Sequence, residues 1–134
     1  ASTSTSTGAV IISNGGLGVA GAICAGGDIG QSSDKRLKHH IQTIGGALAM
    51  VESKHWRGAT WQWKDTSRGI GVSGGVIAQE VREILPHAVM ESPEDGTLSV
   101  KYNTVLAALM NAVKELTGVV RAQGEQIAKL KERL

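Results

Sequence analysis

The last 33 residues of the chain repeat apolar residues at alternating intervals of four and three. A repeat of this length is typical of a coiled coil. Val and Ile at one core position with Leu at the other favour two strands, so the repeat alone does not predict a trimer. A helix that packs only against its own domain is the alternative. The repeat consists of Tyr102, Leu106, Leu109, Val113, Leu116, Val120, Gln123, Ile127, Leu130 and Leu134.

Charge is distributed unevenly along the 134 residues. Residues 1–32 carry a single charge, Asp28, and 8 of the 18 glycines, whereas residues 33–134 carry all 14 basic residues. We therefore predict two domains, 1–32 and 33–134, and the second ends in the helix 102–134. The net charge of +2 gives little support for nucleic-acid binding, and no apolar run is long enough for a membrane span. We predict neither partner.

The first 32 residues are rich in Ser, Thr and Gly, and β-branched residues stand between glycine-containing turns. This pattern predicts short strands. About 30 residues cannot bury enough apolar surface to fold alone. We therefore interpret this region as the end of an intertwined β-structure made by several chains; a flexible linker is the alternative.

The first part of the second domain contains an apolar stripe with helical spacing. The stripe predicts an α-helix, and Gly45 and Gly46 weaken its middle enough to allow a break there. Its members are Leu37, Ile41, Ile44, Leu48 and Val51.

The middle of this domain mixes strand and helix patterns. Residues 59–65 alternate and predict a strand. A short strand at 76–77 leads into a helix that buries Ala78, Val81 and Leu85 and ends at Pro86. Residues 89–100 predict a hairpin that turns at Asp95-Gly96. The fold class that follows for 33–134 is mixed α+β.

The stretch QSSDKRLKHHI, residues 31–41, combines hydroxyl groups with a dense basic cluster. A serine becomes a good nucleophile when another group accepts its proton, and a lysine can do so when burial or nearby cations lower its pKa. If Asp34 caps a helix, Lys38 lies about one turn further on and can fold back toward Ser33. The Ser33 hydroxyl could then attack the carbonyl of Ser32 and form an ester that water opens.

An ordinary capped helix explains the same residues without chemistry, because Ser and Asp are frequent caps. The position of the expected cut favours a self-cleavage site. It falls where the composition changes, so it would separate the glycine-rich region from the charged one. Spacing alone favours the ordinary capped helix.

Residues 33–41 resemble the signature S-D-x-R-L-K-x-x-I of the intramolecular chaperone auto-processing family. These are the self-cleaving C-terminal domains of phage endosialidases, tailspikes and tail fibres. The resemblance covers essentially all of 33–134, and residues 1–29 resemble the repeats that precede this domain in tail fibres. The further matching blocks are Trp61 with Trp63, GVIAQEV (75–81), Leu85-Pro86, Ala88-Val89 and VKYNTVLAALMNAVKEL (100–116).

The resemblance implies a homotrimer whose C-terminal domains register three chains while a triple-stranded β-structure forms upstream. Autoproteolysis between Ser32 and Ser33 then releases the chaperone. By motif, Ser33 is the nucleophile, Lys38 is its general base, and Asp34 and Arg36 hold the geometry. The fibre part is assembled in the bacterial host cytoplasm and joins the virion tail without the released fragment. No cofactor is implied; a non-cleaving trimerisation module is the alternative.

Other polar residues give weaker signals. Many family members have a His where this chain has Ser73, which affects the expected rate of cleavage and not the fold. His39 or His40 could substitute for it. Adjacent helical histidines point in different directions and no Cys or acid completes a set, so we predict no metal site. Gln79 and Glu80 are interpreted as helix-start residues, with contact to the cleavage site as the alternative.

Overall fold

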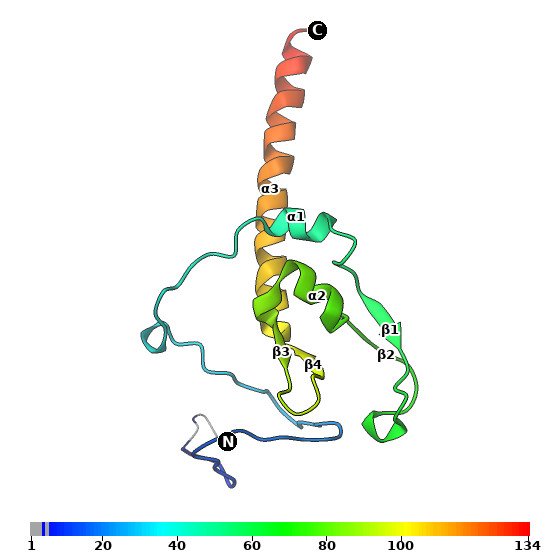
Figure 1. Cartoon of the computed structure of the whole chain (residues 1–134). Coiled ribbons are helices and arrows are strands. Elements are labelled where there is room, and N and C mark those ends of the chain that lie inside the picture. The colour runs from blue at the N-terminus through cyan, green and yellow to red at the C-terminus, as the bar shows by residue number, and fades with distance from the viewer. Residues whose placement is uncertain (1–3, 5) are drawn as a thin grey trace. The chain divides into compact units, whose positions relative to one another are not determined.

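The computed structural model describes residues 4 and 6–134. The chain forms two compact units, one from residues 1–41 and 61–73, the other from 42–60 and 74–134 (Figure 1). The predicted α+β class is confirmed. In order, the elements are η1 (Lys35–Leu37), α1 (Ala47–Glu52), β1 (Ala59–Trp61), η2 (Thr66–Arg68), β2 (Ser73–Gly75), α2 (Ala78–Ile84), η3 (Pro86–Ala88), β3 (Val89–Glu91), β4 (Leu98–Val100) and α3 (Tyr102–Glu132).

The predicted terminal helix is confirmed as α3, which is 31 residues long. Its buried residues are two alanines, Ala108 and Ala112. Such small side chains let other elements approach the helix axis closely, and α1 and α2 lie beside the first half of α3 (Figure 1). Residues 113–134 are all exposed, so the second half of the helix has no cover from its own chain.

The core of the second unit forms where α2 meets α3. Val81 and Leu85 are inward, as predicted, with 3% and 0% of their surfaces exposed. They pack with Ala88 and Ala108. Helix α2 ends before Pro86, because proline has no N–H to donate and its ring collides with the preceding turn.

The predicted hairpin is also confirmed. Strands β3 and β4 are antiparallel, with Val89 opposite Val100. The turn uses Gly96 with a φ of 70°, a conformation that favours glycine, while the Asp95 carboxylate accepts a hydrogen bond of 2.9 Å from the Thr97 N–H. The hairpin leads directly into α3.

The predicted helix along the stripe from Leu37 to Val51 is confirmed only after the glycine pair, where a break was allowed, and is wrong before it. Only the short turn η1 and the six-residue α1 form in this range. His40 and Gly46 have φ values of 51° and 64°, which a right-handed helix cannot contain. Leu37 and Ile41 are 75% and 61% exposed, so the first half of the apolar stripe has no surface to pack against.

Two strand predictions also change. Strand β1 ends at Trp61 rather than at residue 65, because the Asp65 side chain caps η2 instead. The Trp63 ring, beyond the strand, contacts the Trp61 ring edge to face, with centroids 5.9 Å apart. Strand β2, the partner of β1, lies at Ser73–Gly75, just before the predicted position at 76–77.

Among the described residues of 1–32 there is no strand, and nearly all are exposed. The β-structure expected there requires further chains and stays a prediction. No helix in the described part of the chain is sufficiently long and apolar to cross a membrane.

We expect Leu85→Ala to lower the free energy of unfolding by about 2–5 kcal/mol, because it leaves a cavity at a fully buried position. Urea unfolding followed by circular dichroism measures this loss. Ile70→Ala, at a residue that is 93% exposed, is the control and should stay within about 0.5 kcal/mol. Equal effects of the two changes would contradict this core.

Candidate functional site

The cleavage motif forms a single capped turn. Asp34 is the N-cap of η1, and its carboxylate accepts a hydrogen bond of 2.8 Å from the Arg36 N–H. The turn closes when the Lys38 N–H donates to the Lys35 carbonyl. Lys38 itself is extended. This local geometry, rather than an α-helix, brings the side chain of residue 38 back toward residue 33.

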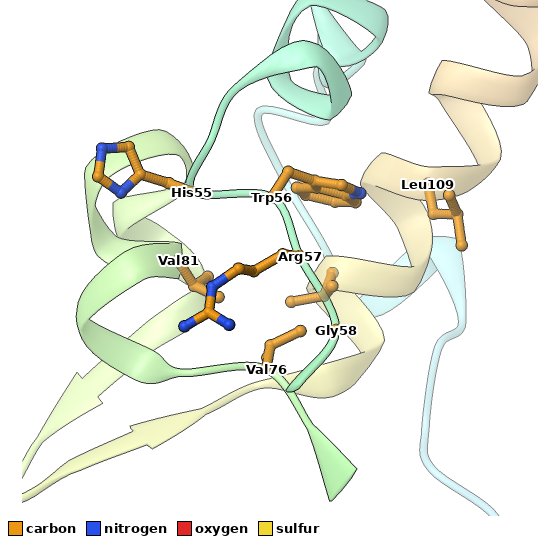
Figure 2. Close-up of a pocket in the computed structure, with 8 residues that line it drawn as sticks. His55, Trp56, Arg57, Gly58, Val76, Val81 and Leu109 are labelled. Atoms are coloured by element: carbon orange, nitrogen blue, oxygen red, sulfur yellow. The ribbon is translucent and has the colours of Figure 1, made fainter. Parts of the chain in front are cut away.

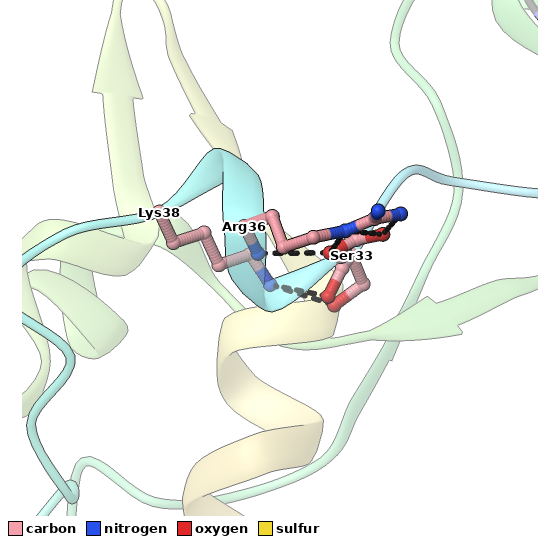
Figure 3. A network of polar contacts seen from close by, with 4 residues as sticks. Ser33, Arg36 and Lys38 are labelled. Atoms are coloured by element: carbon pink, nitrogen blue, oxygen red, sulfur yellow. Dashed lines mark hydrogen bonds and ion pairs between the residues drawn. The ribbon is translucent and has the colours of Figure 1, made fainter.

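The Lys38 amine and the Ser33 hydroxyl are in direct contact. The Lys38 Nζ donates to Ser33 Oγ over 2.7 Å and to the Ser33 carbonyl over 3.1 Å (Figure 3). The pair lies directly after the peptide bond that joins Ser32 to Ser33. The structure therefore brings the two sequence-predicted groups together, and their catalytic roles stay predictions.

Asp34 and Arg36 form a two-pronged ion pair beside this contact. Arg36 Nη2 lies 2.7 Å from Asp34 Oδ2, and Nε is 3.1 Å from both carboxylate oxygens. The Arg36 guanidinium, followed by its backbone N–H, holds the pKa of Asp34 below its ordinary value. In return, Asp34 raises the pKa of Arg36. Both groups therefore stay charged at neutral pH and keep the turn closed.

The whole motif is open to solvent in the single chain. Every residue from 31 to 41 is exposed. A neutral amine at hydrogen-bond distance can accept a hydroxyl proton, and burial of a lysine favours that neutral form. The turn thus supplies contact and orientation, whereas a dry environment has to come from other surfaces.

The remaining candidate residues are distributed over both units. The rings of His39 and His40 meet edge to face, 4.6 Å apart. Ser73 begins β2, and Gln79 lies in the first turn of α2 as predicted. Glu80, in the same turn, pairs with Arg57 at 2.8 Å. Within the described residues, no group of three His, Cys, Asp or Glu side chains could hold a metal.

A small pocket beside the core was not predicted from the sequence. It has a volume of about 160 Å³ and is lined by residues that include Trp56, Val81 and Leu109 (Figure 2). Arg57 lies at its edge and bonds one carboxylate oxygen of Glu80, while the other oxygen is buried without a partner. No sequence signal reveals this pocket, because its walls come from segments up to 54 positions apart.

Comparisons with known proteins give a family and a similar protein for this chain. Residues 33–90 match the model of a peptidase family described as chaperone of endosialidase. The chain is also similar to the long tail fiber protein Gp37 of Salmonella phage S16, with 34% identity over 118 residues. That alignment covers 78% of this chain and 15% of the relative, so the chain spans only a small part of the relative's length.

We expect the turn at 34–37 to persist at neutral pH and to be lost in acid. The pKa of Asp34 is lower in the folded chain than its ordinary value of 3.8. The stabilisation is therefore complete above that value and disappears as pH falls through the lowered pKa. NMR titration of the Asp34 carboxyl carbon and the Arg36 amide measures both events.

The matched control uses a second arginine next to a capping aspartate. Arg36→Gln should move the Asp34 midpoint up toward 3.8, whereas Arg68→Gln, at the end of η2, should leave that midpoint in place. If the titration midpoint of Asp34 is unchanged in the Arg36→Gln variant, the ion pair does not lower this pKa.

Proposed function

Because the chain belongs to the chaperone of endosialidase family through residues 33–90, we propose that it is a segment of a phage tail fibre protein with a self-releasing chaperone. The chaperone assembles three copies and registers the fibre segment before it. It then cuts its own chain between Ser32 and Ser33. The observation that carries this proposal is the 2.7 Å contact between Lys38 Nζ and Ser33 Oγ.

The exposed apolar stripe of α3 supports assembly. Leu106, Val113 and Leu116 are 47–56% exposed, although they lie on a helix whose other face packs against its own unit. Met110 and Val119 are also exposed and make the stripe wider than a two-stranded seam needs. Burial of this stripe among three copies removes apolar surface from water and gives the association its main driving force.

The apolar residues before the motif support a multi-chain fibre end. Val10, Leu17 and Ile29 are 72–83% exposed in the single chain. Pairing between separate chains is non-local and slow, because the ends have to meet before contacts can form. A trimeric chaperone that tethers the three chains removes most of this entropy cost.

In the proposed cut, the only groups that form or break bonds belong to Ser32, Ser33, Lys38 and water. Neutral Lys38 accepts the Ser33 hydroxyl proton while Oγ attacks the carbonyl carbon of Ser32. The C–N bond between Ser32 and Ser33 breaks, the Ser33 nitrogen takes the proton from Lys38, and the acyl group stays on Oγ as an ester. Water hydrolyses this ester, which leaves a carboxylate on Ser32 and a free amino group on Ser33.

The exposure of the motif gives these events an order. In a single chain the Lys38 side chain is exposed to water. Assembly that covers the turn removes this water, and the reaction starts only then. The fibre thus loses its chaperone only after it has formed. Without the chaperone, the folded fibre becomes kinetically stable, because folding can no longer be reversed along the path that formed it.

We expect freshly expressed chain to yield two fragments that meet at Ser32 and Ser33. Ser33→Ala and Lys38→Ala should each slow the cut by about 1,000-fold or more, because the nucleophile and its base act as a unit. Denaturing mass spectrometry over time gives both the cleavage point and the rate.

Two matched variants define the role of the amine. Lys38→Arg keeps the positive charge but cannot become a base at neutral pH, so it should not cut. Lys64→Ala removes an exposed cation outside the motif and should cut near the unaltered rate. An intact chain that still forms trimers would instead identify the non-cleaving trimerisation module.

We expect Val120→Asp to break the trimer, because it adds a charge to a seam position that is 57% exposed in the single chain. Ala122→Asp adds the same charge two residues further on, outside the seam, and should leave the trimer intact. Sedimentation equilibrium of both variants in a Ser33→Ala chain measures the difference. If the Val120→Asp chain is still a trimer, the apolar seam of α3 does not hold the three copies together.

A further inference from the structure

Two polar side chains of α3 hold the segment that follows the cleavage motif. The Glu115 carboxylate accepts hydrogen bonds from the backbone N–H groups of Leu48, at 2.8 Å, and Ala47, at 3.2 Å. One helical turn earlier, the Asn111 amide donates to the Ile44 carbonyl at 3.0 Å. We call Asn111 and Glu115 the clamp.

The segment in the clamp has little stability of its own. It contains Gly45 and Gly46, and Gly46 is the N-cap of α1 without any side-chain hydrogen bond. Helix α1 has six residues, too few for an isolated helix to persist in water. Glu115 therefore supplies from α3 the cap that the local sequence lacks.

We propose that Asn111 and Glu115 are positioning residues for the self-cleavage, an inference that rests on the proposed function. Residues 39–43 alone separate Lys38 from the clamped Ile44. With the clamp closed, the cleavage turn is on a short tether that starts at a fixed point on α3. With the clamp open, the glycines lengthen the tether and the turn samples a larger volume.

The tether matters because the Ser33–Lys38 contact is exposed. The turn has to dock against another surface before the Lys38 amine loses its water. A turn on a short tether has a higher effective concentration at that surface than a turn on a long tether. The clamp thus changes the rate at which a competent site forms. It leaves the chemistry of the turn, and therefore the position of the cut, unchanged.

The clamp also connects the cut to assembly. The turns of α3 that carry Asn111 and Glu115 carry the seam residues Leu109, Val113 and Leu116 on another face. The clamp bonds are already present in the single chain, and association along the seam adds packing to the same turns of α3. Register of the three helices is thereby linked to the cleavage turn through one helix.

The test compares cutting rates in clamp variants of the full chain. Glu115→Ala should slow the cut by about tenfold, with fragment masses and trimer unchanged. Asn111→Ala, which spares the cap of α1, should have a smaller effect. Glu115→Gln keeps one acceptor oxygen and should recover part of the rate. Glu125→Ala is the matched surface control on the same helix and should cut normally.

A second measurement keeps general destabilisation apart from positioning. Val81→Ala weakens the core without touching the clamp and should cut faster than Glu115→Ala at the same loss of unfolding free energy. Hydrogen exchange of the Ala47 and Leu48 amides, in the uncut Ser33→Ala trimer, should speed up in Glu115→Ala only. Equal slowing by Val81→Ala would overturn the inference.

The two proposals fail in different ways. An unaltered chain that never cuts contradicts the proposed function, and the exchange measurement then still tests the clamp contacts. A chain that cuts at the normal rate after Glu115→Ala, with the two amides deprotected, contradicts the positioning role alone.

Discussion

Helix α3 has to serve two sets of partners, and the rest of the structure depends on how its faces are divided. One narrow face carries Ala108 and Ala112, small enough for neighbouring elements to pack closely. Larger side chains there would push these elements away and open the core around Leu85. A neighbouring stripe of larger apolar residues stays exposed. A single helix can therefore organise its own unit and still present a full-length surface for association.

The cleavage motif follows a different principle, because its contacts are local. Asp34, Arg36, Ser33 and Lys38 lie within six residues, and one capped turn is enough to bring them together. The contacts of this turn come from its own residues and from no distant part of the chain. The residues of the turn do not bury one another, so the motif stays exposed in the single chain. We infer that the reactive groups are built by the turn and that their control is left to the surfaces that cover it.

Predictions from the sequence succeeded where the signals were local and self-consistent. Asp95-Gly96 predicted the hairpin, because few other residues tolerate its backbone conformation. The long repeat predicted α3, and Pro86 predicted the end of α2. The helix expected along the stripe before Gly45 failed, because helical spacing has value only when a surface covers the apolar residues. At Leu37 and Ile41 no described surface does so, and His40 and the glycine pair turn the chain away from a helix.

The sequence by itself determined the terminal helix, the hairpin and the closeness of Ser33 to Lys38, since these follow from spacing and backbone preference over short distances. Only the tertiary structure decided which face of α3 is buried, where the pocket lies, and that Glu115 caps a helix 67 positions earlier in the chain. These features depend on contacts between distant segments. Their energy comes from packing and from hydrogen bonds that no local pattern encodes.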